Sequence, residues 1–341
     1  MRVAVYYNNK DVRIEERPAP EINDDEILIK VVASGICGTD VLEWYRIKKA
    51  PIVLGHEIAG IVDKTGKNVK NFKVGDRVTA THHVPCMNCH YCQNEHHTAC
   101  ETLHKTNFHP GGFSEYIRIP KINVELGTFK LPNNVSFDEG TFVEPLGTVV
   151  RAQRLANLSE KQTLLVVGSG VSGLMHIKLA KSKGVKKIIA ADISEYRLNE
   201  AKKFGADYVF DARENVAEKI KQINENRLAD LVIVCTGSLS AAKQALQCVD
   251  KGGTILFFAV PRPDESFEIP INDFWRNEVK MMTSYAAAPD DLKESLNLTA
   301  SGRIGMKNMI THKLKFDEIQ KGFNLVADAK DSLKVIVEPN R

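Results

Sequence analysis

The chain has 341 residues, of which 43% are hydrophobic, and a formal net charge of +3 from 46 basic and 43 acidic side chains. This length suits about two domains, and the even charge balance gives no reason to expect a nucleic acid or an anionic membrane as a partner. No apolar run approaches the roughly 20 residues of a membrane-spanning helix, and residues 1–16 lack the apolar stretch of a signal peptide. We therefore expect a soluble, cytoplasmic protein.

The first part of the chain has the pattern of short strands separated by turns. Residues 26–37 begin as a buried strand, and residues 57–69 alternate between apolar and polar side chains before turning at Thr65 and Gly66. Residues 75–86 follow a Gly-Asp turn, and residues 113–120 alternate again. Short strands with frequent turns predict a small barrel or a bent, partly open sheet.

Near residue 146 the pattern changes to helices alternating with strands that have no polar alternation. The expected helices cover 146–157, 171–184, 195–205 and 240–249, and the expected strands cover 163–168, 187–192, 229–237 and 252–260. Such strands are typical of a parallel sheet covered on both faces. The alternation therefore predicts an α/β fold with a doubly wound sheet.

The end of the chain changes pattern once more. Residues 271–285 are apolar enough to form the last strands of the parallel sheet. After about residue 285 come a helix at 291–302 and short strand pieces that end at 332–339, which we interpret as a return to the first domain. The predicted domains are therefore 1–146 with 286–341, and 147–285.

A glycine-rich turn at the first strand-to-helix junction predicts a dinucleotide site. Gly168 permits the tight turn, Gly170 lets the backbone approach a pyrophosphate, and Gly173 lets helix and strand pack closely. The helix N-terminus then offers free N–H groups to the phosphates. The next strand ends at Asp192, whose carboxylate would accept hydrogen bonds from the ribose hydroxyls and repel a 2′-phosphate, which favours NAD over NADP. Arg197 or another basic side chain could still accommodate that phosphate.

Four of the seven cysteines crowd into residues 86–100, as Cys86, Cys89, Cys92 and Cys100. In a cytoplasmic chain such crowding indicates metal binding rather than disulfides. A closed set of four thiolates is typical of a structural zinc site, in which the metal stabilises a lobe that lacks a core of its own. Because four thiolates complete the zinc shell, we interpret the nearby histidines, His82 and His83 among them, as solvated or packing residues.

A catalytic zinc instead needs three protein ligands and one open position. The candidates are Cys37 after a buried strand, His56 and Glu57 just before another strand, and Glu144 at the transition between the domains. Taken singly these residues indicate little, since a lone cysteine is usually a small core residue.

Together the motifs resemble the zinc-containing medium-chain alcohol dehydrogenase family over essentially the whole chain. The matching stretches, in the family's order and separations, are GICGTD at 35–40, GHEIAGIV at 55–62, GDRV at 75–78, the cysteine lobe at 86–100, GGFSEY at 111–116, EPL at 144–146 and GSGVSG at 168–173. The resemblance is closest to the sorbitol (polyol) and threonine dehydrogenase branches, which carry a glutamate at the position of Glu144. It implies a GroES-like β-rich catalytic domain and a Rossmann domain.

The resemblance also implies roles for individual residues. Catalytic zinc would involve Cys37, His56 and Glu144, with Glu57 as a carboxylate that enters or leaves the shell, and Thr39 would pass the substrate proton outward. Further positions fall where family members approach NAD: Val171 and Ser172 in the glycine turn, Arg197 over the adenine, Thr236, Ala259, Val260 and Ser284. Two zinc ions per chain are thus expected, one catalytic and one structural.

Two departures bear on the substrate. The related branches usually carry a histidine five residues after the first cysteine ligand as part of the proton relay, and this chain has Leu42 there. The arginine pattern by which animal sorbitol enzymes hold their substrate is also missing, since residues 283–287 read TSYAA. We therefore expect a secondary alcohol or polyol as substrate, without naming which.

Several alternatives remain at the level of the sequence. One is L-threonine 3-dehydrogenase activity, and a second is a zinc-free reductase on the same fold. A third, from another class, is a zinc-ribbon module that binds nucleic acid or protein, against which the dinucleotide fingerprint and the near-neutral charge argue. The family resemblance implies a homotetramer or a homodimer, with residues 271–285 in the subunit contact.

Overall fold

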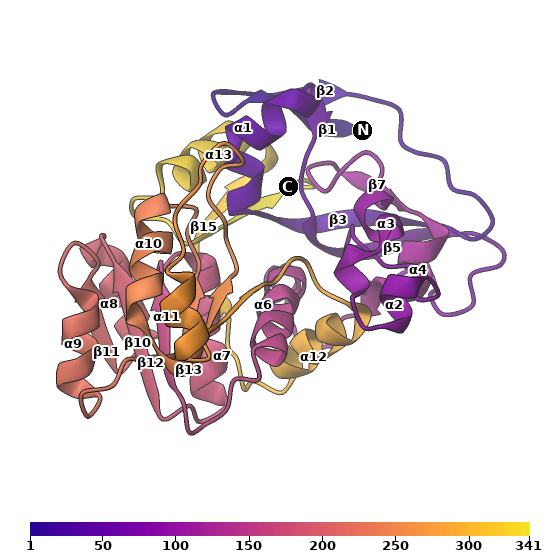
Figure 1. Cartoon of the computed structure of the whole chain (residues 1–341). Coiled ribbons are helices and arrows are strands. Elements are labelled where there is room, and N and C mark those ends of the chain that lie inside the picture. Colours follow the sequence, from indigo (N-terminus) through magenta and orange to yellow (C-terminus); the bar gives the residue numbers. More distant parts are fainter. The chain divides into compact units, whose positions relative to one another are not determined.

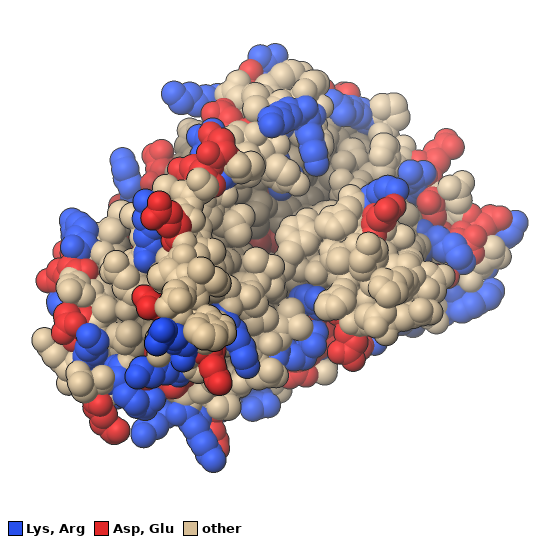
Figure 2. All heavy atoms as spheres, in the orientation of Figure 1, with Lys and Arg blue, Asp and Glu red and all other residues tan.

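The computed structural model describes all residues from 1 to 341. The chain divides into two compact units, the first made of residues 1–147 and 286–341 and the second of residues 148–285 (Figure 1). No helix in either unit has the length and apolar character needed to cross a membrane. Figure 2 shows basic and acidic side chains interspersed over the displayed face, in keeping with the small net charge.

The first unit is built on two sheets. In the larger, strands follow the order β15–β16–β3–β5–β6–β8, and β7 also pairs with β3. Their bounds are β3 Ile27–Ile36, β5 Glu57–Thr65, β6 Arg77–Ala80, β7 Tyr116–Ile119, β8 Thr128–Lys130, β15 Ile310–Lys315 and β16 Lys334–Glu338. The smaller sheet has the order β2–β1–β4, with β1 at Arg2–Asn8, β2 at Asp11–Glu16 and β4 at Ile52–Val53.

The long strand β3 bends as it crosses the unit. Its antiparallel register with β5 shifts twice, between Leu28 and Ile29 and between Val31 and Ala33. Such irregularities increase local bending and twist, and they let β3 pair with β5, β7 and β16 along its length. The two ends of the bent strand are buried in different apolar clusters: Ile27, Ile29 and Val31 lie in one, and Ile36 lies in another. The predicted bent, β-rich domain is confirmed.

Short helices and 3-10 turns connect the strands of the first unit. The α-helices are α1 Glu43–Arg46, α2 His90–Gln93, α3 Glu101–Lys105, α4 Lys121–Leu126, α5 Phe137–Gly140, α12 Pro289–Ala300 and α13 Ile319–Asp328. The 3-10 turns are η1 Gly38–Val41, η2 Ile47–Lys49, η3 His97–Ala99, η4 Lys307–Met309 and η5 Phe316–Glu318. Helix α6 (Val143–Leu155) carries the chain from the first unit into the second.

The second unit contains a six-stranded, all-parallel sheet, as the sequence predicts. The strands follow the order β11–β10–β9–β12–β13–β14. Their bounds are β9 Thr163–Val167, β10 Lys187–Asp192, β11 Tyr208–Asp211, β12 Ala229–Val234, β13 Val249–Phe257 and β14 Lys280–Thr283. The strand order reverses between β9 and β12, which is the point where open α/β sheets bind ligands beyond the carboxyl ends of their strands.

Helices flank the parallel sheet (Figure 1). Their bounds are α7 Val171–Ser182, α8 Glu195–Lys203, α9 Val216–Ile223, α10 Leu239–Cys248 and α11 Ile271–Arg276. One face of the sheet packs Leu165 and Val167 of β9 against Ile220 of α9 and Ala245 of α10. All five residues of β9 are buried, because this central strand is covered on both faces, which explains its lack of polar alternation.

Residues 271–285, which the sequence suggests for the last strands of the sheet, form one helix and one strand. Residues Ile271–Arg276 form helix α11, and the strand β14 covers only Lys280–Thr283. The helix buries Phe274 in the apolar cluster but leaves Ile271 and Trp275 exposed, a one-sided burial that suits a helix. It ends at Asn277, and Glu278 then takes a positive φ of 53°.

Candidate active site

The loop after β3 is organised around Cys37. The Cys37 Sγ accepts hydrogen bonds from the Thr39 backbone N–H at 3.5 Å and from the Thr39 hydroxyl at 3.3 Å. The Cys37 N–H donates to Asp40 Oδ2 at 3.0 Å. These contacts wind residues 38–41 into the turn η1 and fix the direction of the Cys37 sulfur.

His56 and Glu57 meet Cys37 at the start of β5. Gly55 before them has φ +93°, and a Cβ on Gly55 would lie 2.7 Å from the Phe113 N, so that only glycine fits this turn. His56 and Glu57 are buried. One potential ligand atom from each of Cys37, His56 and Glu57 lies within 4.8 Å of the others. Thiolate, imidazole and carboxylate form a donor set that suits a catalytic zinc ion.

The fully buried Asp40 orients this group from behind. Its Oδ1 lies 3.5 Å from His56 Nδ1 and 3.6 Å from Arg46 Nη2. Burial alone would raise the pKa of Asp40, but the charges of His56 and Arg46 outweigh burial and lower it. The contact with Nδ1 leaves Nε2 of His56 available to a ligand, the arrangement by which a carboxylate commonly orients a metal-binding histidine.

Glu57 forms a buried ion pair with Lys334 of β16. Both side chains are almost fully excluded from solvent, at 2% for Lys334 and 1% for Glu57. The Lys334 Nζ also lies 5.3 Å from the centroid of the Phe142 ring. A Cβ on Gly35 would come within 2.8 Å of Lys334 Cε, so this glycine makes room for the pair. Lys334 therefore fixes the position of one carboxylate oxygen of Glu57.

Glu144 stands outside the group formed by Cys37, His56 and Glu57. It is the second residue of α6 and is partly buried. Burial raises the pKa of Glu144 to about 7; the charge of His56 opposes the rise and that of Glu57 adds to it. Glu144 is thus electrostatically coupled to the group, although the structure does not bring its oxygens within the same 4.8 Å.

The pair His82 and His83 packs next to the candidate ligands. The His82 ring centroid lies 4.8 Å from that of His56 and 3.7 Å from that of His83. Burial, together with the charge of His56, holds the pKa of His82 well below its usual range, and burial lowers the pKa of His83 to about 4. His82 is therefore a packing residue, and its partner His56 is what the sequence interpretation did not specify.

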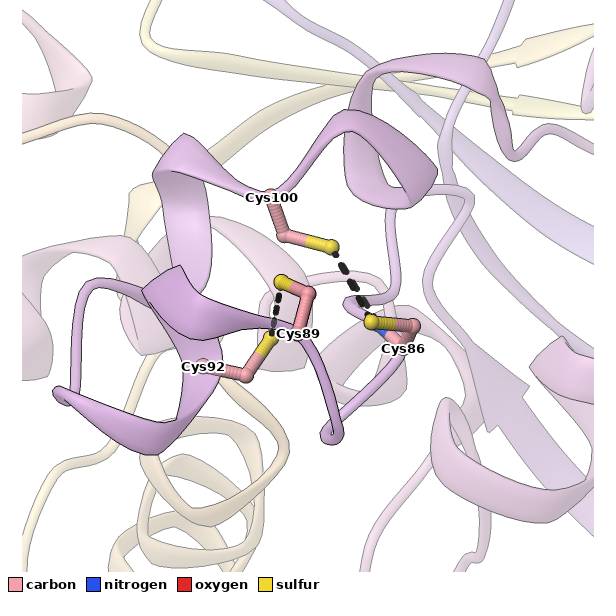
Figure 3. A group of neighbouring side chains, drawn as sticks. All are labelled: Cys86, Cys89, Cys92 and Cys100. Atoms are coloured by element: carbon pink, nitrogen blue, oxygen red, sulfur yellow. Dashed lines mark hydrogen bonds between the residues drawn. The ribbon is translucent and has the colours of Figure 1, made fainter.

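The four-cysteine lobe gathers its sulfurs at one point (Figure 3). Cys89 and Cys92 Sγ lie 3.6 Å apart, as do Cys86 and Cys100 Sγ. A tetrahedral zinc site with Zn–S bonds of about 2.3 Å separates its sulfurs by about 3.8 Å, whereas a disulfide joins them at about 2.05 Å. The spacing therefore fits a zinc ion held by four thiolates. Few apolar residues support the lobe, chiefly Leu103 with Ala286.

In the second unit, the glycine turn joins β9 to α7 as predicted. Gly168 has φ +93°, and a Cβ on Gly173 would overlap the Gly168 carbonyl oxygen. A Cβ on Gly170 would meet nothing within 4 Å, so the space before the N-terminus of α7 is open. Val171 and Ser172 begin that helix, whose exposed N–H groups fit a pyrophosphate.

The other predicted cofactor residues follow the carboxyl ends of neighbouring strands. They are Asp192 at the end of β10, Thr236 after β12, Ala259 and Val260 after β13, and Ser284 after β14, while Arg197 lies in α8. The parallel strands bring these positions to one edge of the sheet. Asp192 Oδ2 accepts a 2.7 Å hydrogen bond from the Ser169 N–H, and Oδ1 accepts one from the Ser194 N–H at 2.9 Å.

Two family matches cover most of the chain. Residues 23–132 match the alcohol dehydrogenase GroES-like domain, and residues 172–301 match the zinc-binding dehydrogenase domain. The sorbitol dehydrogenase of Bacillus subtilis (strain 168) is 33% identical over 354 aligned positions, covering 100% of this chain and 98% of that enzyme. D-xylulose reductase A of Aspergillus oryzae (strain RIB 40) is 33% identical, covering 94% of this chain and 91% of that enzyme.

A solved structure has the same fold. It is described as a zinc-binding dehydrogenase from Sinorhizobium meliloti 1021 bound to NADP. It superposes with a TM-score of 0.88 at 26% sequence identity and covers 99% of both chains. The likeness therefore includes the residues of both units.

Proposed function

Because the chain belongs to the zinc-containing medium-chain alcohol dehydrogenase family, we propose that it interconverts a secondary alcohol or polyol and its ketone with NAD as the hydride carrier. Membership of the family makes it an oxidoreductase that acts on CH–OH groups with NAD(P). The proposal goes further in naming NAD, two zinc ions and the residues that serve them. The alternative of a zinc-ribbon binding module is set aside, because the family matches are to dehydrogenase domains.

One observation carries the proposal: Cys37, His56 and Glu57 converge within 4.8 Å, with the Thr39 hydroxyl hydrogen-bonded to Cys37 Sγ. A zinc ion held there supplies Lewis acidity to an alcohol or carbonyl oxygen, and a nicotinamide accepts or donates the hydride. Thr39 would then lie beside the alcohol as it deprotonates, and its hydroxyl can take that proton while giving its own to water, since Thr39 is exposed. Asp40 and Lys334 orient His56 and Glu57 for this task.

The role of Glu144 follows from its partly buried carboxyl. A neutral carboxylic acid donates a hydrogen bond, and a carboxylate accepts one or binds a metal. We assign Glu144 to the zinc site as a carboxylate that reaches the group formed by Cys37, His56 and Glu57, either directly or through water. Burial raises the pKa of Glu144 to about 7, and a zinc ion in the group would lower that pKa by stabilising the charged form.

NAD is supported by Asp192 and by the glycine turn. Both Asp192 oxygens accept hydrogen bonds from backbone N–H groups, which fixes the carboxylate where the adenosine ribose would lie. That charge favours two ribose hydroxyls over a 2′-phosphate. The NADP bound to the Sinorhizobium protein makes a direct comparison of the two cofactors necessary. Gly168, Gly170 and Gly173 would hold the pyrophosphate at the start of α7.

We assign a structural zinc to the four-cysteine lobe. The two sulfur–sulfur distances of 3.6 Å suit the tetrahedral geometry, and the lobe has few apolar contacts to hold it otherwise. Metal binding would then contribute directly to folding.

We also propose that the protein is a homo-oligomer, a dimer or a tetramer, that uses the open edge of its parallel sheet. Strand β14 is the last strand on that side. In α11, the helix that precedes β14, Ile271 is 73% and Trp275 74% exposed. These two apolar side chains lie one helical turn apart and would be covered by a partner subunit. Light scattering coupled to size exclusion tests this directly: a mass above one chain of 38.0 kDa supports the proposal, and a monomer contradicts it.

A panel assay tests the function itself. Sorbitol, xylitol, a cyclitol, 2,3-butanediol, L-threonine and 2-propanol are each incubated with zinc-loaded protein and NAD or NADP, and reduced cofactor is followed by absorbance. We expect NADH formation with at least one alcohol, and its loss when the metal is chelated. Turnover only with L-threonine would favour the threonine dehydrogenase alternative, and turnover that persists in metal-free protein would contradict the proposal.

A further inference from the structure

Arg46 is the side chain that holds Thr39. Its Nε donates a 2.9 Å hydrogen bond to the Thr39 carbonyl oxygen, and its Nη2 donates one of 3.3 Å to the Thr39 Oγ1. The same Nη2 lies 3.6 Å from Asp40 Oδ1. The Arg46 side chain is only 14% exposed although it ends the short helix α1. A long cationic side chain is ordered in this way at a loss of conformational entropy, so a role for the contact is expected.

The hydroxyl of Thr39 is almost fully engaged as a result. A hydroxyl has one proton to donate and two lone pairs that accept. The Thr39 proton is directed at Cys37 Sγ, and one lone pair accepts from Arg46. A single lone pair remains. We propose that Arg46 is a positioning residue that fixes the Thr39 hydroxyl, so that this one lone pair accepts the hydrogen bond of the substrate alcohol. As Thr39 takes the substrate proton it gives its own proton to water, which reaches it because Thr39 is exposed.

The inference rests on the proposed function and deepens it at the place where the sequence departs from its relatives. Residue 42 is a leucine, and its side chain offers no site for a proton. Arg46 cannot take over the transfer, because a guanidinium has five donors and no acceptor. It can only orient the hydroxyl. Arg46 therefore holds the Thr39 hydroxyl in one orientation and takes no part in the proton transfer itself.

Arginine suits this role better than lysine would. The guanidinium presents Nε and Nη2 in a rigid plane, and the two groups reach the carbonyl and the hydroxyl of one residue. A lysine ammonium could reach either oxygen, but it lacks the fixed fork. The ion pair with Asp40, which also binds the Cys37 N–H, further aligns Arg46 with the candidate zinc ligands.

The test compares R46M, R46K, T39V and the double variant R46M/T39V in the zinc-loaded protein. R13M is the matched control, because Arg13 forms a surface pair with Asp11 in which both side chains reach solvent. Measurements are kcat and KM with the best alcohol of the panel, zinc content, and the Kd of NADH by fluorescence. Removing one charge-assisted hydrogen bond corresponds to a loss of about tenfold or more.

We expect R46M to lower kcat about tenfold or more while KM, zinc content and the Kd of NADH stay within about twofold. In the T39V background R46M should change kcat by less than about twofold, because the hydroxyl it positions is gone. R46K should recover only part of the loss, and R13M should match the wild type. A further variant, R46A, leaves room for a small cation in place of the side chain. Guanidinium ion at millimolar concentration should raise the kcat of R46A, and ammonium at the same concentration should not.

An R46M variant with wild-type kcat would overturn the inference, and so would an equal drop in the Thr39 and T39V backgrounds. Loss of zinc from R46M would overturn it too, because Arg46 would then hold the metal site rather than Thr39. If the wild type turns over no alcohol, the proposed function fails. Urea unfolding of the wild type, R46M, T39V and R46M/T39V then decides the positioning claim: coupled midpoint shifts support it, and additive shifts contradict it.

Discussion

The ion pair of Lys334 and Glu57 makes the sharpest prediction about stability. Replacing Lys334 by methionine keeps the volume of the side chain and leaves the Glu57 carboxylate buried without its partner. Two unit charges about 3 Å apart attract each other by about 5 kcal/mol at an effective dielectric constant of 20. Breaking a buried pair from one side costs about 3–5 kcal/mol. We therefore expect K334M to lower the free energy of unfolding by about that amount.

A double variant separates charge from packing. In K334M/E57Q the stranded carboxylate becomes an uncharged amide, whose unsatisfied burial costs only about 1–3 kcal/mol. The double variant should therefore be more stable than K334M. K67M serves as the matched control, because Lys67 and Asp24 form a pair whose side chains are 75% and 55% exposed, and its midpoint should not move.

The assay is urea unfolding followed by circular dichroism in the C37S background, where by this account no catalytic zinc ion shares the Glu57 carboxylate. Zinc content is measured for each variant. Free energies are extrapolated linearly to water, and an unchanged m value shows that the unfolding reaction is the same. The reasoning would be refuted if K334M in this background fell within about 1 kcal/mol of C37S itself, or if adding E57Q lowered its stability further.

Three more predictions concern other parts of the chain. C89S should retain about one zinc ion per chain and melt at a lower temperature; an unchanged melting temperature with full zinc content would contradict the structural site. D192N should raise the Kd of NADH about tenfold and reduce the preference over NADPH; an unaltered ratio in titrations would remove the case for NAD. Burial lowers the pKa of His176 to about 3, so the folded protein resists a proton that the unfolded chain takes up near pH 6.5. Above pH 6.5 this residue should not reduce stability, and below pH 6.5 it should lower the free energy of unfolding by up to about 1.4 kcal/mol per pH unit. The stability of H176L should therefore fall less steeply than that of the wild type in urea titrations between pH 5 and 7.

The fold was largely predictable because its signals are local. Uninterrupted apolar strands such as 163–168 and the glycine turn at 168–173 specify a parallel sheet and its ligand edge within a few residues. Helix α11 was not predicted because it is short and as apolar as a strand. Only the structure shows its helical burial, with Phe274 buried between exposed neighbours. The register of β3 depends on strands far along the chain and leaves no local signal.

The candidate site was predictable only where a motif carries it. Cys37, Thr39, His56 and Glu57 come from two short motifs, and the structure brings them together. The residues that contact them are distant in the sequence. Lys334 lies 277 residues from Glu57, and His82, which follows β6, packs its ring against His56. A lysine in the apolar stretch 333–337 was the one available sign of a buried charge. The sequence around Arg46 gives no sign of its role, because an arginine in a polar segment usually faces solvent.

The central claim is that Cys37, His56 and Glu57 hold a catalytic zinc ion that serves an NAD-linked alcohol dehydrogenase. Its most direct test is to measure zinc content, NADH affinity and alcohol-dependent NADH formation in C37S and the wild type, prepared in parallel. The account predicts about two zinc ions per chain in the wild type and about one in C37S, with turnover abolished and the Kd of NADH unchanged. A C37S protein that keeps both its zinc and its turnover would contradict the account.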